Sequence, residues 1–159
     1  MTLQAQVQQA LAGLLSFSSG DERLDIVEGG QRLHCRLLAL DSMACAFGEL
    51  TLHSDRLTGM KPAQLKKVAE QLSTRLTYLL EPISPIETDA TGCVVQMRSN
   101  PPQKDADSTS YYELLVAHTG TLSLTRYTRP AGQSRQTIPA QVTREVFTRL
   151  VGDLSAAAG

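Results

Sequence analysis

The sequence predicts an α+β fold, in which helices pack on a single antiparallel sheet. Residues 23–53 read as three strands joined by tight turns, and such turns make neighbouring strands antiparallel. Apolar residues recur at helical spacing in three other segments, and the strands come in runs that the helices separate. We therefore expect the order helix, three strands, helix, three or four strands, helix, with six to seven strands in the sheet. A chain of 159 residues with 42% hydrophobic content is expected to form one domain over residues 1–159.

The first predicted helix spans residues 3–16, and three strands follow it. In the helix, the apolar residues at spacings of three and four are Leu3, Val7, Ala10, Leu11, Leu14 and Leu15. The strands turn first at Gly29-Gly30, a pair that suits a two-residue turn with positive φ at both positions. This turn aligns Ile26 with Leu33 and Leu24 with Cys35. The second turn is expected at Asp41-Ser42, which aligns Leu33 with Leu50. Both turns place apolar residues on one face, which we take as the core face.

The second half begins with the most regular helical pattern, from Pro62 through Leu79 and ending before Pro82. Alternating residues around 93–98 predict a strand, and residues 100–110 predict a flexible polar loop. A hairpin turning at Thr119-Gly120 is expected to align Glu113 with Arg126. The last helix follows Pro139, and the tail, residues 155–159, is expected to fray.

The second face of the first three strands predicts an interaction surface, because apolar side chains gather there near the second turn. A contiguous apolar patch on the far side of a sheet is usually covered by another element, a second subunit or a partner. An apolar centre with Arg and Met at its edge also has the usual composition of an interface. The predicted interface residues are Arg36, Leu38, Leu40, Met43, Cys45 and Phe47.

The same face carries a predicted polar row of Asp25, His34 and Glu49 across the three strands. A histidine between two carboxylates could relay a proton or bind a metal. A metal site needs further converging ligands, and none can be named from the sequence. A row of opposite charges is also a common sheet stabiliser, and we prefer that reading.

Charge is balanced overall, with a formal net charge of -1, but not along the chain. Residues 21–55 hold seven acids against three arginines, whereas residues 126–149 hold five arginines against Glu145 alone. Arg126, Arg129 and Arg135 form the candidate anion patch. Contact with nucleic acid through this region is a third alternative, which the lack of interleaved aromatic residues disfavours. Electrostatic pairing or a solvated face explains the arginines more simply.

No motif for a reaction occurs in the sequence. Phosphate-binding glycine loops, a GxSxG elbow, CxxC pairs and HExxH spacing are all missing, so we expect no cofactor, no metal and no catalytic residue. Cys35, Cys45 and Cys93 are predicted to be small buried hydrophobes, and at least one of the three must be unpaired within the chain. No apolar run is long enough for a membrane span, and Met1–Leu15 lacks the features of a signal peptide. We expect a cytoplasmic protein that does not contact a membrane.

The order of helices and strands resembles the type III secretion chaperone fold and its relatives. The resemblance covers most of the chain at the level of element order, without a diagnostic motif. It implies a homodimer that holds extended protein segments. The leading hypothesis is therefore a non-catalytic protein-protein interaction module, chaperone-like and dimeric. The alternative is a small-molecule binding domain or small enzyme with a pocket between helices and sheet.

Overall fold

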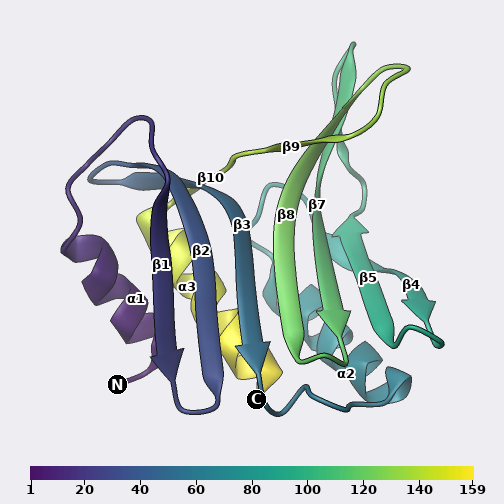
Figure 1. The fold of residues 1–159 in the computed structure, drawn as a ribbon. Helices are drawn as coiled ribbons and strands as arrows, with labels where there is room; N and C mark the ends of the chain where they lie inside the picture. Colours follow the sequence, from purple (N-terminus) through teal and green to yellow (C-terminus); the bar gives the residue numbers. More distant parts are fainter.

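A computed structural model describes all residues, 1–159, and shows three helices on a ten-stranded antiparallel sheet (Figure 1). The α+β class and the predicted order of helices and strand runs are confirmed. In chain order, the elements are α1 (Leu3–Ala12), β1 (Glu22–Glu28), β2 (Gln31–Leu40), β3 (Ala44–Ser54), α2 (Pro62–Arg75), β4 (Ile83–Asp89), β5 (Val94–Ser99), β6 (Gln103–Lys104), β7 (Ser108–Ala117), β8 (Thr121–Pro130), β9 (Gln136–Ile138), β10 (Ala140–Thr143) and α3 (Arg144–Ala158).

The main path of the sheet runs β1-β2-β3-β8-β7-β5-β4. The two halves of the chain meet where β3 pairs with β8, from Glu49 opposite Thr125 to His53 opposite Thr121. Three short strands lie off this path: β10 pairs with β3, β6 with β7 and β9 with β8. Their two to four residues are too few to show a periodicity, which is why the predicted count of six to seven strands was too low.

All three helices lie behind the sheet in Figure 1, and the face toward the viewer carries no helix. Between the two layers is one cluster of 34 buried hydrophobic residues, contributed by both halves of the chain. The predicted core face is thereby confirmed for Leu24, Leu33, Cys35 and Leu50, which all belong to this cluster. We call the other side of the sheet the open face.

The first hairpin has the predicted register, with Ile26 opposite Leu33 and Leu24 opposite Cys35. Of the two turn glycines, only Gly29 has a positive φ, at 56°. The turn therefore needs glycine freedom at its first central position rather than at both.

The second hairpin departs from the predicted register by two residues. The predicted two-residue turn is a four-residue loop, because Leu40 faces Cys45 and Asp41 Oδ1 accepts hydrogen bonds from the backbone N–H groups of Met43 and Ala44. Leu33 consequently faces Leu52, not Leu50. The pairing is also irregular between Cys35 and Ala39, which lets the chain change the side to which residues near Gly48 point.

The hairpin of β7 and β8 is shifted by one residue from the prediction. Its loop contains His118, Thr119 and Gly120, and Gly120 has a φ of 100°. Glu113 therefore faces Thr125, and Tyr112 faces Arg126. A three-residue loop with glycine at the positive-φ position is as regular a hairpin as a two-residue one, and the sequence does not distinguish them.

Two segments expected to be irregular contain regular secondary structure. Residues 100–110 include β6 and the start of β7, and residues 155–158 are the last turn of α3. Ala157 and Ala158 are buried, and the Ser54 hydroxyl donates a hydrogen bond to the carbonyl oxygen of Ala158 at 2.9 Å. The end of α3 therefore packs on the end of β3.

Candidate binding sites

The predicted apolar patch does not form on the open face. Phe47 is fully buried on the helix side, where its ring lies 5.5 Å from that of Phe147. Leu40 and Cys45 also belong to the core, so these three positions were assigned to the wrong face. The cause is the irregular pairing of β2 with β3 between Cys35 and Ala39, which reverses the alternation near the turn. The two-residue shift from the longer loop leaves each residue on its own face.

The other three predicted interface residues remain at the surface to different degrees. Leu38 is half-buried beside Gly48, and Arg36 is exposed and pairs with Asp21 at 3.2 Å. Met43, at the tip of the hairpin, is 75% exposed. Of the six residues, Met43 alone offers a large apolar side chain to solvent.

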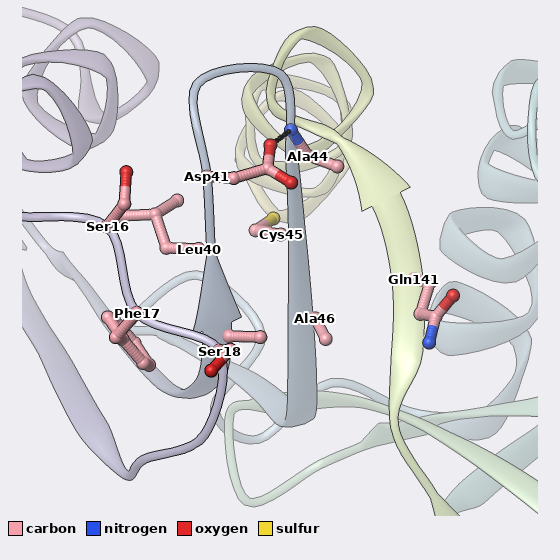
Figure 2. Close-up of a pocket in the computed structure, with 10 residues that line it drawn as sticks. Ser16, Phe17, Ser18, Leu40, Asp41, Ala44, Cys45, Ala46 and Gln141 are labelled. Atoms are coloured by element: carbon pink, nitrogen blue, oxygen red, sulfur yellow. Dashed lines mark hydrogen bonds between the residues drawn. The ribbon is translucent and has the colours of Figure 1, made fainter.

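A hollow of about 520 Å³ lies at the same end of the sheet, and we call it the hairpin hollow (Figure 2). Figure 2 shows Ser16, Phe17 and Ser18 on one side of the hairpin and Gln141 of β10 on the other. Six of the ten lining residues are hydrophobic, and five are alanine or serine, whose short side chains leave the space open. The lining residues are Ser16, Phe17, Ser18, Ala39, Leu40, Asp41, Ala44, Cys45, Ala46 and Gln141.

The walls of the hairpin hollow are fixed by backbone pairing. Phe17 and Leu40 exchange two backbone hydrogen bonds of 2.8 Å, so the segment after α1 continues the sheet beside β2. The two backbone N–H groups that Asp41 binds lower the pKa of its carboxyl group, which keeps the loop acceptor ionised. The hollow is therefore a built feature of the hairpin and not a gap beside a loose loop.

The predicted polar row is only partly assembled. His34 Nδ1 lies 2.6 Å from Asp25 Oδ1, as the first hairpin requires. Glu49 is not in the row: the two-residue shift places Thr51 opposite His34, and the Thr51 hydroxyl donates to Glu49 at 3.0 Å. His34 and Asp25 form an exposed pair, without a third ligand. No group of three His, Cys, Asp or Glu side chains is placed to hold a metal ion.

Arg126, the first residue of the predicted anion patch, lies on the helix side of the sheet and is buried. Its guanidinium binds both carboxylate oxygens of buried Glu81, at 3.0 and 3.3 Å, and also Gln103. It covers the ring of Tyr112 at 4.6 Å. Arg126 is therefore already paired, and it is separated from Arg129 and Arg135 by the sheet.

On the open face, Arg129 and Arg135 meet a residue that sequence reasoning did not include, Arg98 of β5. Together with Gln96 and Tyr111, these arginines line a polar pocket of about 600 Å³ beneath the loop of residues 130–135, which we call the guanidinium pocket. Tyr111 and Tyr127 lie side by side with ring centroids 5.9 Å apart. Gln96 and Arg98 share one face of β5 because alternate residues of a strand do, but the loop that brings Arg135 to them has no sequence signal.

Glu113 holds the guanidinium pocket together. Its Oε2 atom accepts hydrogen bonds from Gln96 at 3.1 Å, Arg98 at 3.3 Å and Arg135 at 2.6 Å. Burial by itself raises the pKa of Glu113, but the hydrogen bonds from Arg135, Gln96 and Arg98 outweigh it and hold the pKa below the usual value. Glu113 is thus a carboxylate with three donors, poorly suited to act as a base.

The two buried thiols, those of Cys35 and Cys45, are similarly unreactive. Burial raises the pKa of Cys45 to about 12, and burial also raises that of Cys35. All three cysteines are free, and a protonated buried thiol is a poor nucleophile. None of the three helices has the length and apolar character that crossing a membrane requires.

The geometry therefore presents two candidate sites, an apolar hollow beside an exposed methionine and a polar pocket rich in arginine. Comparison of the chain with protein-family models, with curated proteins and with solved structures finds no match in any of the three. The function must be argued from these two sites.

Proposed function

We propose that this chain is a non-catalytic protein-interaction module that pairs with a second copy of itself through the hairpin hollow. The observation that carries the proposal is the position of Met43, 75% exposed at the tip of the hairpin whose sides line the hollow. A two-fold interface needs one surface that carries both a projecting group and its receptor. Met43 and the hollow are such a pair.

The chemistry of Met43 and of the hairpin hollow supports a second copy of the chain as the partner. Methionine is flexible and enriched in interfaces, and it fills irregular apolar spaces well. Leu15, which precedes the lining residue Ser16, is 89% exposed and extends the apolar surface. An exposed apolar surface of this kind marks an interaction site more often than free surface.

A cluster of 34 buried residues fills the space between the helices and the sheet. This packing favours the hairpin hollow over an internal pocket as the binding site. A small apolar ligand is the second candidate for the hairpin hollow, since about 520 Å³ lies within the range of ligand sites. A protein that stays monomeric and binds an apolar fluorescent dye at this hollow would favour that candidate.

The role implied by the element order extends the proposal. In this extension the dimer acts in the cytoplasm and holds an extended segment of another protein. It predicts that the wild type suppresses the aggregation of a thermally unfolding reporter enzyme, and that a monomeric variant does so less well.

The primary test is solution mass by light scattering on the wild type and two variants. Met43→Asp removes the projecting group, and Ala39→Glu fills the hollow without touching Met43; we expect a wild-type dimer and two folded monomers. Ile86→Asp is the control, because Ile86 is an exposed apolar residue on β4, at the far edge of the sheet. A wild type that is monomeric at all concentrations, or variants that remain dimeric, would overturn the proposal.

A further inference from the structure

The guanidinium pocket is unusual in how its charge is arranged. Arg98, Arg129 and Arg135 line it, and Glu113 is the carboxylate that binds two of them, which leaves a formal surplus of two positive charges. No carboxylate is among the residues that line the pocket. Glu49 opposite Thr125, Glu87 opposite Gln96 and Asp107, whose carbonyl oxygen accepts from the Ala131 N–H group at 2.8 Å, all lie outside the lining.

Arg126 provides a comparison, because it is an arginine with a purely structural role. Its side chain is 5% exposed, and both of its terminal nitrogens bind one carboxylate, so its charge is neutralised within the chain. The side chains of Arg98 and Arg135 are 35% and 40% exposed and share one carboxylate oxygen. The pocket arginines are therefore reachable from solvent and incompletely compensated.

Much of the hydrogen-bonding capacity of these arginines is unused. A guanidinium carries five N–H donors. Arg98 donates from Nη2 to Glu113, and its Nε–H is buried without a partner in the chain. Arg129 donates from Nε to the carbonyl oxygen of Gln133 at 3.3 Å, which leaves both of its terminal nitrogens without a hydrogen bond in the chain.

The pocket is also held in shape before any ligand arrives. The Arg98 guanidinium lies 4.6 Å from the centre of the Tyr111 ring, and that of Arg135 lies 3.8 Å from the centre of the Tyr127 ring. Stacking on an aromatic ring and a hydrogen bond to Glu113 together restrict each side chain. Donors fixed in advance lose less entropy when they bind an anion.

We propose that the guanidinium pocket binds a phosphoryl dianion, the group presented by inorganic phosphate, a phosphate monoester or a phosphorylated side chain. Such a group carries about 1.5 to 2 negative charges at neutral pH, with three acceptor oxygens. This charge matches the surplus in the pocket better than a single carboxylate does. Arginine forks also suit the spacing of phosphoryl oxygens.

This site is independent of the hairpin hollow. The pocket residues Arg98, Tyr111 and Arg135 come from β5, β7 and the loop before β9, whereas the hollow is lined by the β2–β3 hairpin, β10 and the segment after α1. In Figure 1, β3 and β8 separate β2 from β7 and β5. Phosphoryl binding and self-association can therefore succeed or fail separately.

The test is a titration of the full chain with inorganic phosphate at constant ionic strength, followed by calorimetry and by amide NMR. We expect one saturable site, with shifts confined to residues 96–98, 111–113 and 129–135. Arg129→Gln should weaken binding about tenfold or more, because a charged hydrogen bond contributes about 1.5 to 3 kcal/mol. Arg129 makes no hydrogen bond to Glu113, so the variant should keep its fold, which circular dichroism checks.

Arg23→Gln is the matched control, since it removes the same charge from an exposed residue on the distant strand β1. It should change the dissociation constant by less than about twofold. A glycine-flanked phosphoserine peptide distinguishes the sources: tighter binding than inorganic phosphate indicates a phosphorylated protein, and equal binding indicates a free phosphate. The proposal fails if phosphate does not saturate, or if Arg23→Gln and Arg129→Gln weaken binding equally.

Discussion

The role of an individual residue in this protein depends on its burial and on the partners with which it interacts. Arg126 and Arg98 have the same chemistry, and strand pairing places both beside β7, yet one is sealed against Glu81 and the other faces a solvent-filled pocket. Ser99 adds to the buried site, because its hydroxyl donates to Glu81 at 2.7 Å and accepts from the backbone N–H of Tyr112 at 2.8 Å. The Glu81 side chain thus ties the segment after α2 to β5, β7 and β8.

Glu81→Ala should destabilise the fold by about 3 to 5 kcal/mol, because it leaves the Arg126 guanidinium buried without its carboxylate. The free energy of unfolding in urea, followed by circular dichroism, measures the loss.

The double variant Glu81→Met with Arg126→Met is the control, because it removes both charges and leaves apolar groups in their place. It should recover most of the stability that Glu81→Ala loses. A loss of less than about 1 kcal/mol in Glu81→Ala would show that solvent reaches Arg126 after all.

At the scale of elements, loop length decided the register of the hairpins, which the periodicity of the strands does not determine. The main helices, the longer strands and the core face of the strands away from the β2–β3 turn were predictable from spacing. The four-residue loop at Asp41 and the three-residue loop at His118–Gly120 then shifted two registers. Those shifts exchanged Glu49 for Thr51 beside His34 and separated Glu113 from Arg126. The irregular pairing of β2 with β3 moved Phe47 into the core.

The end of α3 provides a test of an element that sequence analysis expected to fray. Ala158 is 1% exposed, whereas Ala156, on the other side of the same turn, is exposed. Ala158→Asp should cost about 3 kcal/mol or more, because it buries a carboxylate without a partner.

Ala156→Asp is the matched control for Ala158→Asp. It places the same charge at the same helix end, where the helix dipole costs about 1 kcal/mol or less. Thermal unfolding of the two variants measures the difference. Equal and small effects would mean that the last turn of α3 is detached in solution.

For the whole molecule, the pairing of β3 with β8 joins halves that sequence reasoning left unconnected. The core cluster continues across that seam through Leu50, Leu52, Leu122 and Leu124. The helices α1 and α3 also contact each other, so the first and last elements pack in one layer. A single core shared by both halves favours a single cooperative transition.

Unfolding in denaturant should therefore give coincident transitions from probes in each half. All four tyrosines follow residue 77, and the chain has no tryptophan, so tyrosine fluorescence reports on the second half. In a Cys93→Ser variant, thiol reactivity reports on buried Cys35 and Cys45 in the first half. Midpoints that differ beyond experimental error would show that the halves unfold separately.

The sequence by itself determined the fold class, the order of the helices and strand runs, the core face of the strands away from the β2–β3 turn, and the positions of the hairpin turns. These follow from local spacing and turn chemistry, which involve neighbours along the chain. Tertiary structure alone decided the sheet order, the hairpin hollow and the assembly of Arg98, Glu113 and Arg135 into one pocket. Each of these depends on loop lengths and on the pairing of strands that are far apart in the sequence. A shift of one residue in such a pairing exchanges every cross-strand contact, although the pattern of apolar residues along the sequence stays the same.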